Sequence, residues 1–469
     1  SVYGPIAGAP NIFNVVNLDK SQKKTPKTGW HEQTQSFFYS LELGWKSQLF
    51  VTTTGRNDWA SQLANSPQKS FFYPSVGVSW LPSSTFNFPE KFNYLKIRAS
   101  WASVANPFPR ELTIATHPYD DTISGWDDKS NYPIGQLYPE RTKTWELGFD
   151  ARFLHGFTLS ASWYRADTYN QTFNPNLSAS SGYSDIYIQT GHVRNTGVEA
   201  SLGYDHQWKN WNWNSQFTFS WNKNKIIELC KEWYNPITEE TITMNRLQIS
   251  KLGRAKFILK EGGSMGDLYS TTDLRRDDKG NIEIDEGGNV VVEDNLPDMK
   301  LGSVFPDYYL AWRNSVSWKN LNLGFLVTAR IGGIVNSLTQ ANMDLFGVSE
   351  ATAAARDAGG ALVNGRSLVN PETWYTAIAS QGGIPQYYTY SATNVRLQEL
   401  SLGYTIPRKW LHNVCSITVS FVGRNLWMMY CKAPFDPEAV ASTNNFYQGM
   451  DYFMMPSTRN LGFNINIKF

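Results

Sequence analysis

Residues 460–469 read Asn-Leu-Gly-Phe-Asn-Ile-Asn-Ile-Lys-Phe and alternate polar with apolar positions to the last residue. Because successive residues of a β-strand point to opposite faces, this run predicts a strand with one apolar and one polar face. The same alternation recurs along the whole chain. A closed barrel in a membrane needs this pattern, since lipid lies outside and water inside. We therefore predict an all-β protein that crosses an outer membrane as an antiparallel β-barrel.

The composition favours a barrel over other classes of protein. Among 469 residues, 42 basic and 41 acidic side chains give a net charge of +1, which provides no electrostatic footprint for nucleic acid. Aromatic residues make up 14% of the chain although its mean hydropathy is −0.40. No run reaches the length of about 18 apolar residues that a membrane helix requires. Barrels, in contrast, place Trp and Tyr in girdles at both membrane interfaces.

Period-two alternation predicts thirteen strands. They span about 34–45, 48–57, 69–81, 93–104, 144–153, 157–165, 192–206, 210–222, 306–318, 321–331, 393–405, 414–429 and 458–469. In the strand at 321–331, Leu323, Phe325 and Val327 should face lipid, while Thr328 and Arg330 should face the lumen. The pattern shifts near Leu400, which predicts a β-bulge there. Strand tryptophans such as Trp145, Trp163, Trp213 and Trp221 should face lipid or belong to the aromatic girdles. Arg152, Arg313 and Arg330 should face inward and contact lumen water and a plug rather than a substrate.

The connections alternate in length. Short turns fall at 46–47, 155–156, 209–210 and 319–320, and long segments at 58–68, 105–141, 170–191, 223–305, 333–392 and 430–457. Outer-membrane barrels have short periplasmic turns and long external loops, whereas a soluble sandwich has no reason to alternate. Counting back from an inward-running last strand places residues 1–33 in an external loop. Since an odd strand number cannot close an ordinary bacterial barrel, we expect the carboxy-terminal part of a longer barrel.

Eight stretches, in colinear order over nearly the whole chain, resemble the SusC family (SusC/RagA) of TonB-dependent outer-membrane transporters from Bacteroidetes-type bacteria. They are 54–58 (TGRND), 73–80 (YPSVGVSW), 95–101 (LKIRASW), 144–150 (TWELGFD), 195–199 (NTGVE), 396–407 (RLQELSLGYTIP), 423–426 (GRNL) and 435–438 (FDPE). The resemblance implies a 22-stranded barrel filled by an amino-terminal plug. Residues 34–469 would supply about thirteen carboxy-terminal strands, with the plug and first strands absent, and 1–33 an external loop region.

The resemblance also implies partners and an activity. A SusD-like surface lipoprotein would cap the external mouth, TonB would energise import through the absent amino-terminal part, and transporter–lid pairs would form a dimer in lipid. The cargo would be an oligosaccharide or an oligopeptide. A passive porin or secretion barrel, or an outer-membrane enzyme, remains as an alternative reading of the strand pattern.

Aromatic residues in the predicted external loops are the candidate ligand contacts. They are Trp126, Tyr132, Trp374, Tyr375, Tyr387 and Tyr388. Flat aromatic faces beside a few polar groups suit sugar rings and peptide side chains. The alternative is that these residues pack the loops against one another and against the lid.

We find no pattern typical of catalysis or of a cofactor. Loop carboxylates are numerous: Asp120, Asp121, Asp127, Asp128, Asp277, Asp278, Glu293 and Asp294. A glycosidase would need two of them at a defined separation, which sequence alone does not provide. The six histidines lack metal-ligand spacing, and no G-x-S-x-G or P-loop motif occurs. The loop at 283–294 resembles a calcium loop of the family, but Gly287 replaces an oxygen ligand, so a solvated acidic loop is the simpler reading.

Overall fold

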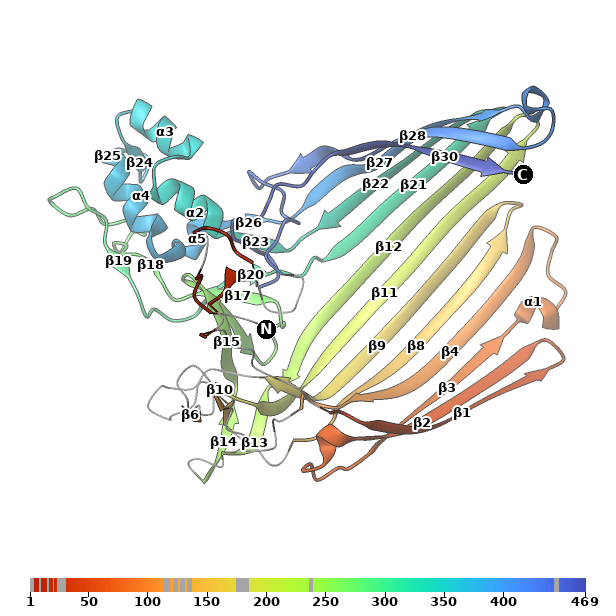
Figure 1. The fold of residues 1–469 in the computed structure, drawn as a ribbon, viewed down its shortest axis with the longest axis horizontal. Helices are drawn as coiled ribbons and strands as arrows, with labels where there is room; N and C mark the ends of the chain where they lie inside the picture. The colour runs from red at the N-terminus through yellow and green to blue at the C-terminus, as the bar shows by residue number, and fades with distance from the viewer. Residues whose placement is uncertain are drawn as a thin grey trace.

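The computed structural model describes residues 4–7, 10–14, 17–19, 21–22, 31–110, 112, 119–120, 125–126, 131–132, 137–173, 185–235, 239–442 and 447–469. One antiparallel sheet of thirteen strands, ordered as in the sequence, curves into a barrel wall (Figure 1). Its strands are β1 (Thr34–Trp45), β2 (Leu49–Ala60), β3 (Phe71–Trp80), β4 (Phe92–Asn106), β8 (Glu140–Phe153), β9 (Phe157–Phe173), β11 (Ile188–Trp208), β12 (Trp211–Glu228), β21 (Tyr308–Trp318), β22 (Leu321–Ile331), β27 (Asn394–Ile406), β28 (Ser416–Cys431) and β30 (Asn460–Lys468). The predicted all-β antiparallel barrel architecture is confirmed.

The wall has two open edges within the described residues. β1 pairs only with β2, and β30 pairs only with β28. Every residue of both edge strands is exposed. In the described part of 1–33, Ile6 and Leu18 form an isolated bridge. The assignment of this segment to an external loop stays a prediction.

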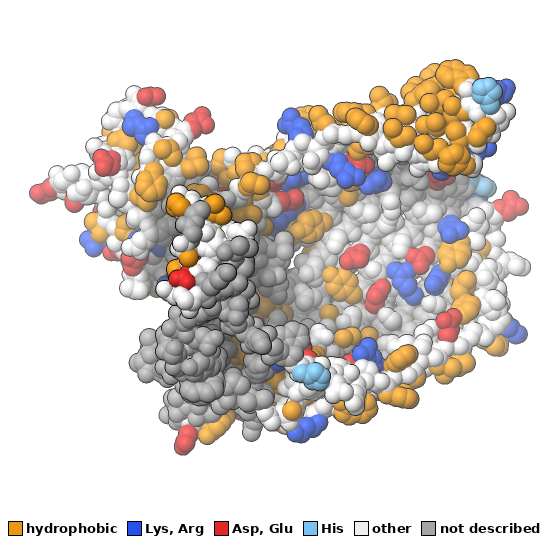
Figure 2. Space-filling model, in the orientation of Figure 1, with side chains coloured by type: hydrophobic (Ala, Val, Ile, Leu, Met, Phe, Trp, Pro, Cys, Tyr) orange, Lys and Arg blue, Asp and Glu red, His pale blue; other side chains and the backbone are white. Residues whose placement is uncertain are grey.

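The pairing register decides which side chains share a face, because residues directly opposite in antiparallel strands point to the same side. One such row crosses seven strands through Arg98, Gly148, Ser162, Glu199, Ser220, Tyr309 and Arg330. Figure 2 shows charged side chains on the concave side of the wall. Leu323, Phe325 and Val327 alternate with Thr328 and Arg330 along β22 and lie on the opposite, convex face. Both predicted faces are therefore confirmed.

The β-bulge predicted near Leu400 is confirmed and lies at Gln398. Gln398 is skipped where β27 pairs with β22, and the register with β28 shifts at the same place. Opposite it, Asn425 adopts a left-handed φ of 52°. Because of this shift, Arg396 and Glu399 point to the same side of the sheet, although strict alternation would separate them.

The two ends of the wall differ. Short turns and the small helix α1 (Pro82–Thr85) lie at one end with the carboxy terminus, and folded loops at the other (Figure 1). The loops contain β5 (Tyr119–Asp120), β6 (Gly125–Trp126), β7 (Asn131–Tyr132), β10 (Asp185–Ile186), β13 (Cys230–Asn235), β14 (Glu240–Met244), β15 (Arg246–Leu252), β16 (Ala255–Lys260), β17 (Asp267–Ser270), β18 (Asp273–Leu274), β19 (Val292–Glu293), β20 (Met299–Ser303), β23 (Ile334–Ser337), β24 (Ala361–Val363), β25 (Ser367–Val369), β26 (Thr389–Ser391) and β29 (Met450–Asp451). This arrangement has the loop asymmetry of an outer-membrane barrel.

The loop helices are short. They are α2 (Leu338–Leu345), α3 (Glu350–Asp357), α4 (Pro371–Ala379) and α5 (Pro385–Tyr388). Helices α2, α3 and α4 each begin at a side-chain cap. Among the described residues, 3₁₀ turns fall at η2 (Ser61–Leu63), η4 (Ser380–Gly382) and η5 (Arg408–Leu411). The Ser337 hydroxyl accepts the amide of Gln340 at the start of α2, which satisfies a backbone donor the helix cannot. No helix in the described residues is long and apolar enough to cross a membrane.

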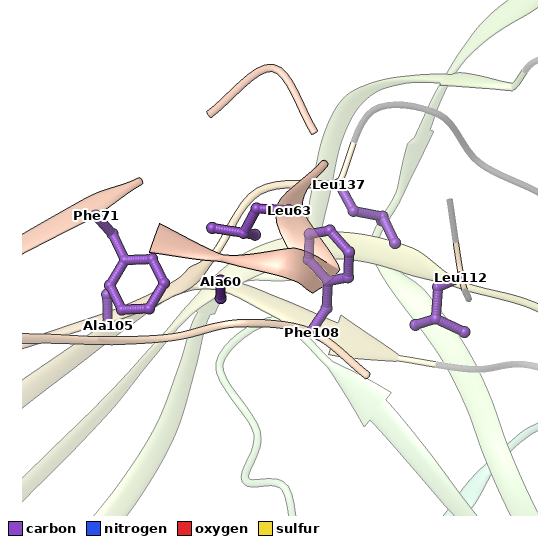
Figure 3. Close-up of a cluster of buried hydrophobic side chains, with 7 residues drawn as sticks. All are labelled: Ala60, Leu63, Phe71, Ala105, Phe108, Leu112 and Leu137. Atoms are coloured by element: carbon purple, nitrogen blue, oxygen red, sulfur yellow. The ribbon is translucent and has the colours of Figure 1, made fainter. Parts of the chain in front are cut away.

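A small hydrophobic core lies at the external ends of the first strands. Buried apolar side chains from β2, β3, β4 and their flanking loops meet there (Figure 3): Ala60, Leu63, Phe71, Ala105, Phe108, Leu112 and Leu137. The Ser66 hydroxyl donates to the Leu137 carbonyl at 2.5 Å. Loops packed in this way are extensions of the wall with their own hydrophobic interior.

Candidate functional site

The concave face holds a polar hollow of about 570 Å³. Its lining side chains include Arg98, Ser160, Ser162, Glu199, Ser201, Thr218, Ser220, Tyr309, Thr328, Arg330 and, from an external segment, Glu438. These are hydroxyls and charges of both signs, contributed by strands that the register places side by side. Such a surface can bind water and polar ligands along the wall.

Charged pairs on this face are partly solvated. Arg98 Nη1 lies 2.6 Å from Asp150 Oδ2, and the Ser160 hydroxyl donates to Asp150 Oδ1 at 2.6 Å. The side chains of Arg98 and Asp150 are 31% and 32% exposed. Pairs with this exposure contribute little to stability, and both side chains remain accessible to solvent on the concave face.

The three arginines predicted to face inward do so by register. Arg152 stacks over the Tyr94 ring, with 5.1 Å from its Cζ to the ring centroid. Arg313 pairs with Gln216 on the concave side. Arg330 is buried, and its Nη2 donates to the Val304 carbonyl at 2.7 Å. Arg330 therefore fastens an external segment to the wall.

A four-stranded sheet of β15, β16, β17 and β20 forms part of the external layer. Asp298 holds strands of this sheet together and forms what we call the Asp298 clamp. The two carboxylate oxygens of Asp298 accept hydrogen bonds from Nε and Nη2 of Arg246 at 2.6 and 2.9 Å. Lys260 Nζ lies 3.0 Å from the same carboxylate. The Arg246 hydrogen bond, with help from Lys260, lowers the pKa of Asp298 to about 2.

This clamp predicts acid sensitivity of the external sheet. A lowered pKa in the folded state means that Asp298 stabilises the sheet fully above its usual pKa near 3.8 and loses this effect as the pH falls toward 2. Arg246 is 43% exposed, so we expect a contribution on the order of 1 kcal/mol after solvent screening. The protection factors of the 246–260 amides, which remove the intrinsic pH dependence of hydrogen exchange, should fall between pH 5 and pH 2 in the wild type. Asp298→Asn should have lower protection factors already at pH 5, and these should change little as the pH falls; the same pH response of the protection factors in this variant as in the wild type would contradict the assignment.

Four of the six candidate aromatic residues meet in one hydrophobic cluster. Trp374, Tyr375, Tyr387 and Tyr388 pack there with Ile378 and Ile384 among others. The Trp374 and Tyr387 rings meet edge to face, with 5.9 Å between centroids. Tyr388 is 1% exposed and donates its hydroxyl to Asp344 Oδ2 at 3.0 Å; burial, reinforced by Asp344, raises its pKa.

Tyr388 therefore packs the loops against one another, as the alternative interpretation predicts. Tyr375 also borders a hollow of about 460 Å³ with Asp344, Arg356 and Glu372, so a ligand contact by its exposed part stays a prediction. Trp126 and Tyr132 lie in β6 and β7. Their side chains fall outside the described residues, and their role in binding also stays a prediction.

The acidic loop contains two turns of the same design. Asp277 Oδ1 accepts the amides of Lys279 and Asn281, and Asp285 Oδ1 accepts the amide of Asn289. Hydrogen bonds from Asn281 and Asn289 keep the pKa of these carboxyls below the usual value. In the described part of the chain, no three His, Cys, Asp or Glu side chains gather as metal ligands would. Asp121, Asp127 and Asp128 lie outside the described residues.

The sequence pattern did not reveal a buried ion pair at the rim of the wall. Arg396 is 5% exposed, and its Nη1 and Nη2 contact the Asp436 carboxylate at 3.1 and 2.8 Å. Its Nη2 also lies 3.2 Å from Glu438, whereas Nε donates to Asn394 Oδ1. Burial opposes ionisation of Asp436, but the Arg396 hydrogen bonds lower its pKa overall. The only available signal was that both ends of the pair lie in the family-like stretches 396–407 and 435–438.

A second pair of family-like stretches meets in the same way. Arg56 Nε donates to Asp58 at 2.7 Å, and the Tyr73 hydroxyl donates to the other Asp58 oxygen. Gly55 lies so close to Tyr39 that an added Cβ would stand 2.4 Å from the ring.

The model of the protein family described as "TonB dependent receptor-like, beta-barrel" matches residues 3–426 of this chain. The chain belongs to this family.

Relatives and solved structures agree with this membership. TonB-dependent receptor P3 of Formosa agariphila is 26% identical over 99% of this chain and 49% of its own length. TonB-dependent receptor SusC of Bacteroides thetaiotaomicron is 21% identical over 80% of this chain and 38% of its own. A structure of the RagAB peptide importer in the closed-closed state aligns with a TM-score of 0.75 at 19% identity, covering 98% of this chain and 50% of that chain.

Membership decides location and class. The chain is an outer-membrane protein, and the predicted resemblance to the SusC family is confirmed. The family consists of receptors and transporters, so the prediction that the chain is not an enzyme is confirmed as well. The chain spans about half the length of the curated relatives it matches.

Proposed function

We propose that this chain forms part of an active importer of oligosaccharides or oligopeptides that works with a SusD-like lipoprotein lid and is energised through TonB. The observation that carries the proposal is the polar hollow of the wall, whose rim is lined by Glu438 of an external segment. A ligand that leaves the external loops toward the lumen would contact this polar hollow next. Transporter–lid pairs assembling as dimers would agree with the family resemblance.

The charge pattern of the hollow favours peptides over neutral glycans. Arg98 and Arg330 alternate there with Glu199 and Glu438, and Tyr309 is its one large aromatic ring apart from Phe219, whose side chain points outward. Charges of both signs complement zwitterionic chains, whereas sugar rings are commonly bound on aromatic faces. The similarity to the RagAB peptide importer agrees with this choice.

A passive porin is the competing function. A porin needs no partner above its mouth, so its external loops would have no reason to expose large apolar side chains. Phe346, Val348, Leu362 and Leu368 are 76%, 69%, 64% and 61% exposed in the outermost loop. Exposed apolar residues of this size are typical of a binding surface, and a lid lipoprotein is the partner that we propose for them.

The test replaces two of these residues. Phe346→Ser with Leu368→Ser should weaken capture of the lid lipoprotein about tenfold, because well-packed apolar anchors dominate such interfaces. Uptake of labelled oligopeptides by cells should fall in parallel, and uptake of labelled glycans should be negligible before and after. Val414→Ser, which alters an equally exposed residue at the opposite end of the wall, is the control. Full lid capture by the double variant would refute this contact; peptide entry that persists without TonB would refute active import.

A further inference from the structure

The convex face of the wall carries a band of basic residues near its external end. We define this basic band by the strand residues Arg141 and Lys143 of β8, Arg165 of β9, Arg194 of β11, and Lys223 and Lys225 of β12. Register brings them together: Lys143 and Arg194 are both opposite Asp167, and Arg194 is opposite Lys225. Thus four adjacent strands contribute to one cluster.

The opposite face of the same strands is covered by the external loops. Thr168, Asn195, Asn222 and Asn224 line a hollow together with Met265 and Phe305 of the loop layer. These residues alternate with the basic band along β9, β11 and β12. The basic band therefore points away from the lumen, toward the surroundings of the barrel.

Neighbouring aromatic residues indicate where the basic band lies relative to the membrane. Trp145, Trp163 and Trp221 are each the next outward-facing residue on the membrane side of Lys143, Arg165 and Lys223. Trp residues of membrane barrels concentrate at the boundary between hydrocarbon and headgroups. The basic band thus begins where the apolar belt ends, at the level of the lipid headgroups.

The charges of the basic band are only partly neutralised from within. The six cations of the basic band have two acidic residues near them. One is Asp167, and the other is Glu228, which lies opposite His192 at the external end of the band. Asp167 accepts Nε of Arg165 and Nε of Arg194 at 2.8 and 2.7 Å and also contacts His192. This shared carboxylate fixes the two guanidinium groups.

The lysines are free to bind another anion. Among the residues that the structure describes, Lys143, Lys223 and Lys225 have no ion-pair partner, and all three are exposed. Lys143 Nζ lies over the Tyr169 ring at 5.4 Å, which holds its ammonium near the Asp167 cluster. Fixed guanidiniums beside exposed ammoniums suit an anion with several oxygens, because guanidinium forks bind phosphate oxygens.

We propose that the basic band binds the phosphate groups of an outer-leaflet lipid and fixes this lipid to the external rim of the barrel. Clusters of Lys and Arg at headgroup level attract anionic lipids, and the adjoining Trp side chains would contact the acyl chains of the same molecule. The site does not depend on which cargo the importer carries. It adds a lipid ligand to the outer surface of the wall.

The first test measures lipid that remains bound during purification. The variant Lys143→Gln with Lys223→Gln and Lys225→Gln is made in the full-length protein and extracted from its own outer membrane in mild detergent. We expect lipid phosphate per barrel to fall about fivefold relative to wild type. The control replaces three exposed turn lysines at the other end of the wall, Lys46, Lys209 and Lys319, by Gln, and should keep the wild-type amount. Equal retention in both variants, or equal loss from both, would overturn the proposal.

The second test identifies the ligand. Delipidated wild-type protein is titrated with micelles of bisphosphorylated lipid A, with the dephosphorylated lipid, and with inorganic phosphate, and Trp fluorescence reports binding. We expect binding of the phosphorylated lipid alone, about tenfold weaker in the triple variant and weakened by salt. Equal binding of the dephosphorylated lipid would exclude phosphate recognition. Inorganic phosphate that binds as tightly as the lipid would assign the band to free anions instead.

Discussion

Val327→Arg is expected to destabilise the membrane-inserted barrel by roughly 2–4 kcal/mol, the cost of placing a guanidinium on the lipid face near the bilayer midplane. Val327 lies in the middle part of β22, opposite Trp312 of β21 and Leu397 of β27. Both neighbours are apolar residues on the same convex face, so the new charge would find no partner there. Urea unfolding of the protein from lipid vesicles, followed by Trp fluorescence, measures the loss.

Thr328→Arg is the matched control for this prediction. Thr328 is the next residue of the same strand, but it lines the polar hollow on the concave face. An arginine there can reach water, and its cost should be below about 1 kcal/mol. Equal destabilisation by the two substitutions would show that the faces are misassigned.

Arg396→Met is expected to release the segment 432–442 from the rim of the wall. Removing this guanidinium leaves Asp436 beside the wall without its partner, and breaking a buried ion pair in this way costs about 3–5 kcal/mol. The loss is local, because Arg396 lies at the external end of β27. Limited proteolysis and hydrogen exchange of 432–442 should therefore change while the wall stays folded.

Arg424 provides the control for this second prediction. It pairs with Glu399 at 3.1 Å on the neighbouring strands, but its side chain is 66% exposed. Arg424→Met should cost less than about 1 kcal/mol. Adding Asp436→Asn to Arg396→Met should restore part of the protection, since an uncharged amide is cheaper to bury. A double variant as labile as Arg396→Met would contradict the ion-pair explanation.

Sequence alone was sufficient for the wall because lipid imposes a local rule. Each membrane-facing residue must be apolar whatever its distant neighbours are, so Leu323, Phe325 and Val327 could be assigned from their own alternation. The same rule locates the bulge only approximately. A bulge leaves only a one-residue shift in the pattern: Leu397 and Leu400 share the convex face although they are three residues apart, and the sequence does not show which residue between them is the extra one.

The loops obey no such rule. The sequence predicts the aromatic residues of 370–390 as possible ligand contacts, because an exposed binding surface and a hydrophobic core use the same side chains. Only the packing of Tyr388 against Asp344 distinguishes the two. In the same way, Arg396 and Asp436 stand 40 residues apart, and no spacing rule connects them. Contacts between distant segments need the folded chain.

The paired turns at 277–281 and 285–289 bear on how the external layer assembles. Each closes through hydrogen bonds that span at most four residues, and a closure this short loses little chain entropy. Local contacts also form quickly. Turns that carry their own hydrogen-bond partners let this segment begin folding before its contacts with distant parts of the chain have formed.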